Sequence, residues 1–360
     1  MWPKWFKEMH WPLITAVIGL VLIGTLFVYS AAFHDSGAYG SKQPFWVLAG
    51  LAVFFAIPFI GYRTFLSISY LLYVISIGML LAVFVIGEER LGAQRWINIG
   101  PLAIQPSEFA KFATICALAN FLGSHHPWEK KKRIVLTGLA IVFVPFLLIA
   151  KQPDLGSSLP FLTLGLVLLF LWGIPYRALI ATGTLGLISA PLLWTFLKDY
   201  QKKRILVFLN PNLDPLGAGY TAIQSRIAVG SGGLLGKGYL AGTQSQLQFV
   251  PEHHTDFIFC VIGEEWGFAG SLTLLLFYGF LFNAAFQIME NTTDVKAKLM
   301  IAGVLSVLFT QIVINIGMTF GLVPITGITL PLVSYGGSSL IASTLAFGMI
   351  LSVYKERSIF

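Results

Sequence analysis

The sequence predicts an all-α polytopic membrane protein with about ten transmembrane helices. Of its 360 residues, 56% are hydrophobic and only 11% are charged, whereas soluble domains average about 45–50% apolar and about 25% charged residues. Apolar runs recur along the chain at roughly the 17–22 residues needed to cross about 30 Å of hydrocarbon. A soluble fold of this composition would expose too much apolar surface to stay in solution.

The spans are predicted in order from these apolar runs. The N-terminal stretch combines three tryptophans (Trp2, Trp5, Trp11) with Lys4 and Lys7, which is typical of an anchor at the membrane interface. The eighth run is long, so we expect it to tilt or to begin outside the hydrocarbon core. The predicted spans are 12–33, 44–61, 68–87, 106–123, 134–150, 157–173, 178–197, 257–286, 298–321 and 335–354, within a single integral membrane domain, 1–360.

Basic residues predict that both termini lie in the cytoplasm. With the N-terminus inside, the short outer connections hold four basic residues, namely Lys42, Arg90, Arg95 and Lys151. The inner connections and tails hold twelve, namely Lys4, Lys7, Arg63, Lys130, Lys131, Lys132, Arg133, Arg177, Lys296, Lys298, Lys355 and Arg357. This orientation puts the polar segments 88–105, 151–156, 198–256 and 322–336 on the outer face, where we expect the function to lie.

Two of these outer segments have structure of their own. The segment 198–256, between spans seven and eight, is predicted to be a long extracytoplasmic loop, and it is too long for a passive connection. The spacing of Ile223, Ile227 and Ala228 suits a short helix on the membrane surface. The segment 322–336 is apolar but broken by Pro and Gly, which favours a re-entrant segment lining a cavity over an interfacial loop.

Charged residues at two outer helix junctions leave two interpretations open. Glu108 and Lys111 share one face of a helix that begins at Pro106. They form either an ion pair that fixes the helix end or a charged pair facing a polar cavity. Asp154 is either the N-cap of the next span or part of the same polar site.

The glycine-rich stretch 230–238 does not fit a phosphate-binding P-loop. Ser231 stands where that motif needs glycine, and Gly238 stands where it needs Ser or Thr. The glycines instead suit a tight turn, and Lys237 could still meet a phosphate as a point charge. Nucleic acid is excluded as a partner, because the basic residues are scattered through the loops.

Asp256 is the candidate catalytic residue. It lies where the polar stretch PEHHT meets the apolar stretch FIFCVI, so one side of its carboxylate is poorly solvated and its pKa should rise. Such a carboxylate within reach of a hydroxyl is a general base, although a helix N-cap role stays open. The neighbouring His253 and His254 form no zinc motif, and we expect them in a hydrated loop.

Several motifs together resemble the SEDS family (shape, elongation, division and sporulation) over nearly the whole chain. They are Arg95-Trp96, QPSEFAK at 105–111, QPDLG at 152–156, AVGSGGLLGKG at 228–238, PEHHTDFIF at 251–259 and NIGMTFGLVPITGITLPLVSYGGSSL at 315–340. The NIGM start and the PE-x-HTDF form resemble the elongation branch, the RodA-like proteins, more than the division branch.

This resemblance implies a peptidoglycan glycosyltransferase of the bacterial cytoplasmic membrane, with ten spans and an active outer face. It implies polymerisation of lipid II during cell elongation together with a class B penicillin-binding protein. The essential aspartate of the family falls on Asp256, and its charged cavity pair falls on Glu108 and Lys111.

We therefore expect an inverting transfer in which Asp256 takes the proton from the acceptor 4-hydroxyl and isoprenyl diphosphate leaves. The leaving group needs positive charge. The predicted substrate-binding residues are Glu108, Lys111, Arg95, Asp154, Arg204 and Lys237. No metal ligands and no certain cofactor are predicted, but a divalent cation could share this task.

Two other classes of function compete with an enzyme. A lipid II flippase would place polar groups near the membrane midplane in two related repeats. Here the charges gather at one face and no repeat is visible, which favours the enzyme. A scaffold for wall-synthesis partners would leave Asp256 and the Glu108–Lys111 pair without a purpose.

Overall fold

A computed structural model of the chain describes residues 9–33, 38–90, 93–100, 102–126, 131–196, 199–215 and 217–357. The predicted anchor residues Trp2, Lys4, Trp5 and Lys7 lie outside the described residues, as does Lys130. The α-helices are α2 (Trp11–Ala31), α3 (Ala38–Ile60), α4 (Tyr62–Ser67), α5 (Ser69–Ile86), α6 (Pro106–Gly123), α7 (Lys131–Lys151), α8 (Leu155–Trp172), α9 (Tyr176–Phe196), α10 (Asp199–Leu209), α11 (Ala218–Ser231), α12 (Thr243–Gln246), α13 (Ile258–Glu265), α14 (Gly267–Glu290), α15 (Val295–Phe320) and α16 (Gly337–Arg357).

The prediction of an all-α polytopic membrane protein is confirmed. Within the described residues, eight helices are long and apolar enough to cross a membrane, namely α2, α3, α5, α7, α8, α14, α15 and α16. Helices α6 and α9 lie at the two remaining predicted positions. Helix α6 carries the charges of Glu108 and Lys111, and it is buried along most of its length, so neighbouring helices surround its polar groups.

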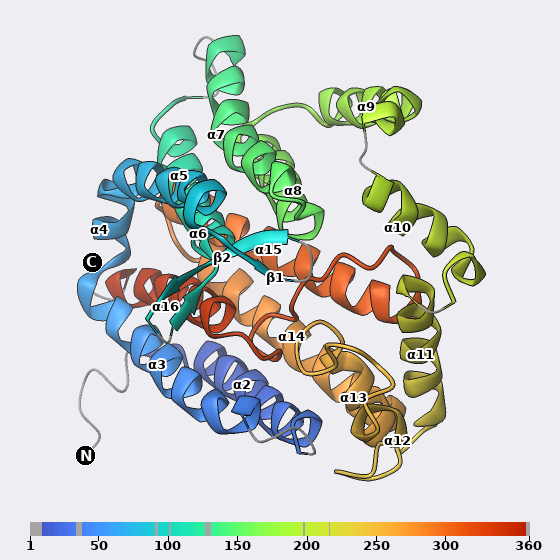
Figure 1. The fold of residues 1–360 in the computed structure, drawn as a ribbon. Coiled ribbons are helices and arrows are strands. Elements are labelled where there is room, and N and C mark those ends of the chain that lie inside the picture. Colours follow the sequence, from blue (N-terminus) through green and yellow to red (C-terminus); the bar gives the residue numbers. More distant parts are fainter. Residues whose placement is uncertain are drawn as a thin grey trace, which may run out of the picture.

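Helix α15 forms the centre of the bundle and packs against α6, α8 and α14 (Figure 1). Its most apolar stretch is 78% buried inside the protein, whereas that of α5 is only 22% buried and faces outward. A Cβ at Gly303 of α15 would lie 2.9 Å from Ile115 of α6 and 3.0 Å from Leu164 of α8. A small residue here lets the three helices approach closely, as membrane helices commonly do.

The predicted eighth span, 257–286, is divided into α13 and α14 by a break at Trp266 and Gly267. Gly267 has a φ of +62°, and a Cβ there would lie 2.4 Å from the backbone nitrogen of Gly236. The glycine-rich turn after α11 therefore packs into the break. The apolar run continues through this point, so its hydropathy alone could not predict the interruption.

A small antiparallel sheet occupies the segment 88–105, where no strand was predicted. It consists of β1 (Glu88–Arg90), β2 (Ala93–Ile99) and β3 (Leu102–Ile104) in the order β1-β2-β3. Ile97 of β2 is buried, and Gln105 donates its backbone N–H to Ser338 Oγ at the start of α16. The sheet thus leads directly into the start of α6.

The segment 198–256 contains α10, a 3-10 turn (Pro211–Leu213), α11 and α12. Helix α11 packs against α13 and α15, burying Ala228 while Ile227 stays exposed. The segment 322–336 is non-helical, with Ile328, Leu330 and Val333 buried. These two segments meet at Asp256.

Candidate active site

The backbone of Asp256 is held from the centre of the bundle. The side-chain amide of Asn315 on α15 donates from Nδ2 to the carbonyl oxygen of Asp256 at 2.8 Å and to that of Ile328 at 2.6 Å. A Cβ at Gly327, whose φ is +75°, would lie 3.1 Å from Asp256 Oδ2. The fully buried amide of Asn315 therefore fixes both Asp256 and the segment 322–336, which lies against the Asp256 carboxylate.

Burial raises the pKa of Asp256 to about 7, and the charge of Glu252 adds to this effect. Arg95 and Arg204 act in the opposite direction, while Asp154 raises the pKa further. A carboxyl group that titrates near neutral pH is well matched to general base catalysis. Of the predicted substrate-binding residues, the structure thus brings Arg95, Asp154 and Arg204 into the electrostatic environment of Asp256.

The structure excludes one of the two interpretations of Asp256, the helix N-cap. Phe257 is the N-cap of α13, and no side chain caps this helix. The Asp256 carboxylate is therefore not used as a helix cap.

Asp154 is the N-cap of α8, as one of its two interpretations predicted, and it also contacts Arg95. It caps α8, accepting the N–H of Ser157 at 3.1 Å, and its other oxygen lies 3.6 Å from Nε of Arg95. Arg95 also donates from Nη2 to the carbonyl oxygen of Pro153 at 3.1 Å. The start of α8 and strand β2 are thereby joined beside the site.

Three buried polar atoms in this region have no hydrogen-bond partner among the described residues. They are Nε of Arg95, Oδ1 of Asn315 and Oγ1 of Thr326. Nε of Arg95 is still ion-paired with Asp154, whereas the oxygens of Asn315 and Thr326 are unsatisfied. Buried polar groups in folded proteins are almost always satisfied, so these two oxygens suit a polar, hydroxyl-bearing ligand.

Glu108 and Lys111 form a buried ion pair of 2.7 Å that lines a cavity between α6, α15 and α16. Both side chains are less than a tenth exposed, and the cavity wall also includes Gln311 and Ser343. The pair is therefore buried in the first turn of α6, with both charges at the cavity wall.

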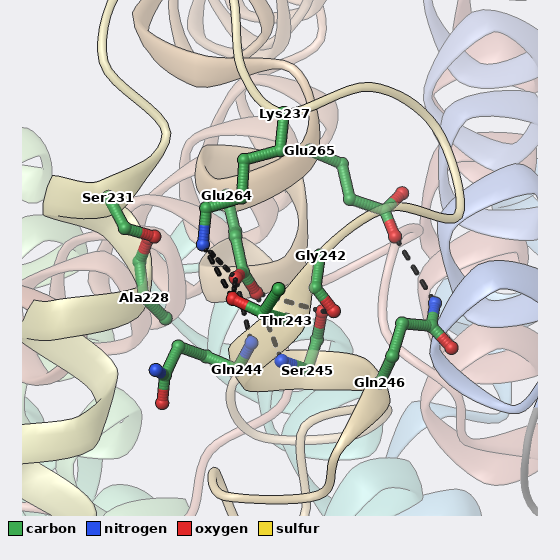
Figure 2. Close-up of polar contacts among 10 residues, drawn as sticks. All are labelled: Ala228, Ser231, Lys237, Gly242, Thr243, Gln244, Ser245, Gln246, Glu264 and Glu265. Carbon is green, nitrogen blue, oxygen red and sulfur yellow. Dashed lines mark hydrogen bonds and ion pairs between the residues drawn. The ribbon is translucent and has the colours of Figure 1, made fainter.

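Lys237 belongs to a second polar cluster, centred on Glu264 (Figure 2). Its ammonium donates to Oε1 of the fully buried Glu264 at 2.7 Å and to Oγ1 of Thr243 at 2.8 Å. The backbone N–H groups of Gln244 and Ser245 donate to the same carboxylate at 2.8 and 2.9 Å. Glu264 thus fastens the turn after α11 and helix α12 onto the C-terminal end of α13.

We expect Glu264→Gln to lower the free energy of unfolding by about 1–3 kcal/mol, because its amide N–H₂ would replace an acceptor of buried N–H groups. The measurement is the unfolding midpoint of the purified protein, together with limited proteolysis within 232–247. Glu290→Gln, at the exposed end of α14, is the matched control and should change neither. An unchanged midpoint and unchanged cleavage in Glu264→Gln would contradict this role.

The expectation of hydrated histidines was wrong. His253 and His254 are both buried, at 4% and 8% exposure. The two ring nitrogens of His253 lie 3.0 Å from the carbonyl oxygen of Val250 and 2.8 Å from that of Ala31. His253 therefore ties the chain before Asp256 to the end of α2.

Sequence reasoning did not single out Asn315, Glu264 or Gly327 as individual site residues. Each acts through partners distant in sequence, since Asn315 is 59 residues from Asp256 and Glu264 is 27 residues from Lys237. Within the described residues, no group of three His, Cys, Asp or Glu side chains is arranged to hold a metal ion.

Comparison with known proteins gives consistent matches over the full chain. The FtsW/RodA/SpoVE family model, described as cell cycle protein, matches residues 10–359. The peptidoglycan glycosyltransferase MrdB of Escherichia coli K12 is 41% identical, covering 96% of this chain and 93% of that protein. The peptidoglycan glycosyltransferase RodA of Treponema pallidum is 34% identical, covering 98% of both.

Solved structures agree with these sequence matches. A chain of a peptidoglycan synthase complex that coordinates polymerization and crosslinking superposes with a TM-score of 0.83 at 36% identity, covering 96% of this chain and 98% of that one. The rod shape determining protein RodA of Thermus thermophilus superposes with a TM-score of 0.74 at 32% identity, covering 99% of both chains.

Proposed function

The chain belongs to the FtsW/RodA/SpoVE family, and we propose that Asp256 is the general base with which it joins the sugars of lipid II. The chain is a peptidoglycan glycosyltransferase, like the named relatives that it matches along nearly its whole length. The observation that carries the role of Asp256 is its carboxyl group, with a pKa of about 7, among unpaired buried polar atoms.

The reaction is a single inverting displacement. Asp256 takes the proton of the acceptor 4-hydroxyl, and the oxygen forms a bond to the donor anomeric carbon. The bond from that carbon to the diphosphate breaks, and its electron pair leaves with the isoprenyl diphosphate. One base and a stabilised leaving group are sufficient, without a second nucleophilic carboxylate.

The predicted substrate-binding residues take different places in this scheme. Arg95 and Arg204 supply positive charge near Asp256, and Asp154 orients Arg95. Glu108 and Lys111 present opposite charges to an interior cavity, where they suit the polar part of the substrate. Lys237 takes a structural role, because its ammonium group is already paired with the carboxylate of Glu264.

The membrane placement follows the charge distribution of the sequence. The excess of Lys and Arg in the short connections on one side supports cytoplasmic termini and an active outer face. In that orientation 198–256 is extracytoplasmic, 322–336 is a re-entrant segment, and the lipid tail of the substrate stays in the bilayer.

A class B penicillin-binding protein is the proposed working partner. The similar chain of the peptidoglycan synthase complex comes from an assembly that coordinates polymerization and crosslinking, which supports a cross-linking partner for this chain.

The test is reconstitution of the purified protein with labelled lipid II, with and without this partner, over a range of pH. The base acts in its deprotonated form, so the rate should rise with pH through about 7 and then level off. A protein that moves lipid II across vesicles but forms no glycan would instead be a flippase.

Glu252→Gln tests the assignment of that pH dependence. Removing this neighbouring negative charge lowers the pKa of Asp256, so the rising part of the profile should move to lower pH. The exposed control Glu290→Gln should leave the profile in place. A profile that is unmoved in Glu252→Gln would contradict Asp256 as the titrating base.

A further inference from the structure

The two backbone carbonyls directly before the proposed base are bound by the non-helical segment that precedes α16. The hydroxyl of Ser334 donates to the carbonyl oxygen of Thr255 at 2.6 Å. The backbone N–H of Tyr335 donates to the carbonyl oxygen of His254 at 3.0 Å. Together with the amide of Asn315 on the carbonyl of the base itself, donors from two separate elements hold three consecutive carbonyls.

Ser334 uses its hydroxyl group both as a donor and as an acceptor. Its proton goes to Thr255, and its oxygen accepts the backbone N–H of Leu330 at 2.8 Å. The backbone N–H of Ser334 in turn donates to the carbonyl oxygen of Leu330 at 2.9 Å, so residues 330–334 close into a turn. A hydroxyl combines both functions in a small volume, and Ser334 is only 5% exposed. Its loss would leave a donor on Leu330 and an acceptor on Thr255 without this partner.

Helices α2 and α14 hold this turn in place. The hydroxyl of the buried Tyr278 on α14 donates to the carbonyl oxygen of Pro331 at 2.6 Å. A Cβ at Gly24 of α2 would lie 2.5 Å from the carbonyl oxygen of Val333, so this helix packs directly against the turn. Leu332 is buried with a φ of +65°, a conformation that a non-glycine residue keeps only when its surroundings enforce it. The position of the turn is therefore set by the helix bundle.

The chain around the base is an irregular series of turns between Pro251 and Phe257. The backbone N–H groups of Thr255, Asp256 and Phe257 all donate to one acceptor, the carbonyl oxygen of Glu252, at 3.1, 3.1 and 3.3 Å. Glu252 has a φ of +51°, which is uncommon for a non-glycine residue. A segment without a regular hydrogen-bond ladder depends on contacts from outside it, so the donors on its carbonyls determine where the base lies.

We propose that Ser334 is a positioning residue for the reaction, and that its hydroxyl sets the place of the Asp256 carboxylate by joining the carbonyl of Thr255 to the turn 330–334. Proton transfer needs the base within hydrogen-bond distance of the acceptor hydroxyl, and a small misplacement of a catalytic group costs rate. Ser334 acts through the backbone of its neighbour and not on the substrate. This inference rests on the proposed function, and it deepens that function by naming a residue that places the base.

The test combines polymerisation of labelled lipid II by the reconstituted protein with hydrogen exchange of the backbone amides of residues 255–257. Ser334→Ala should lower kcat about tenfold or more at an unchanged KM, and these amides should exchange faster. Ser334→Thr keeps a hydroxyl and should recover most of the kcat. The matched control is Ser352→Ala, which removes a fully buried hydroxyl that accepts the backbone N–H of Tyr62 at 2.8 Å near the other end of α16. The control should change neither kcat nor this exchange.

Tyr278→Phe is a second variant, which keeps the ring and removes only the donor to Pro331, so it decides the question if Ser334→Ala does not fold. It should lower kcat less than Ser334→Ala and also speed exchange at 255–257. A parental kcat in the folded variants would overturn the proposal even if exchange is faster, because the hydroxyl would then serve the fold alone. An equal loss in Ser352→Ala would overturn it too. Asp256→Asn in the same assay tests the proposed function separately: if synthesis is lost there while Ser334→Ala keeps the parental kcat, only the positioning role fails.

Discussion

Asp256→Asn should lower the rate of glycan synthesis from lipid II by about 10²–10⁴-fold, the range expected for losing a general base. Asparagine keeps the size of the side chain but cannot accept the proton of the acceptor hydroxyl. The contact from Asn315 is to the backbone carbonyl of residue 256, so the local fold should persist. Glycan length and yield, measured by gel electrophoresis of labelled product, give the rate.

The controls for Asp256→Asn separate chemistry from folding. The unfolding midpoint and lipid II binding should match those of the parental protein, while Asp256→Glu should keep some activity with a shifted pH profile. Glu252→Gln removes a carboxylate four residues away and should retain synthesis. If Asp256→Asn makes glycan at the parental rate, the base is misassigned.

Lys111→Met should lower the free energy of unfolding by about 3–5 kcal/mol, because it leaves the buried Glu108 carboxylate without its partner. The pair lies at 2.7 Å with both side chains less than a tenth exposed, so solvent screens it little. The midpoint of denaturation in mixed detergent measures the loss. Lys298→Met, at an exposed position of α15, should have no comparable effect.

The double variant Glu108→Gln with Lys111→Met decides between the two interpretations of this pair. Replacing both charges removes the uncompensated carboxylate, so most of the lost stability should return. If the pair binds substrate, glycan synthesis stays impaired in this restored protein. Parental synthesis in the double variant would show that the pair serves stability alone.

The membrane architecture could be predicted from the sequence because hydropathy is a local property. Each helix that crosses the membrane must satisfy its backbone internally and present apolar side chains, whatever its neighbours are. The raised pKa of Asp256 could be predicted for a similar reason, because the change from polar PEHHT to apolar FIFCVI shows where the chain leaves water.

The features that were missed depend on contacts between distant segments. The break at Gly267 exists because the turn containing Gly236 packs there, and the burial of His253 depends on the end of α2. The contact of Lys237 with Glu264 also joins segments that are distant in sequence. The sheet at 88–105 consists of strands of three to seven residues, too short for a clear alternating pattern.

The Asn315 amide on α15 binds the backbone carbonyls of both Asp256 and Ile328, so these two chain segments are attached to the same helix. A tilt or slide of α15 would move both together and preserve their spacing. Arg95 and Asp154 are carried by β2 and the start of α8 instead. A displacement of α15 relative to these two elements would therefore change the charge around the base while leaving the base in register with the wall beside it.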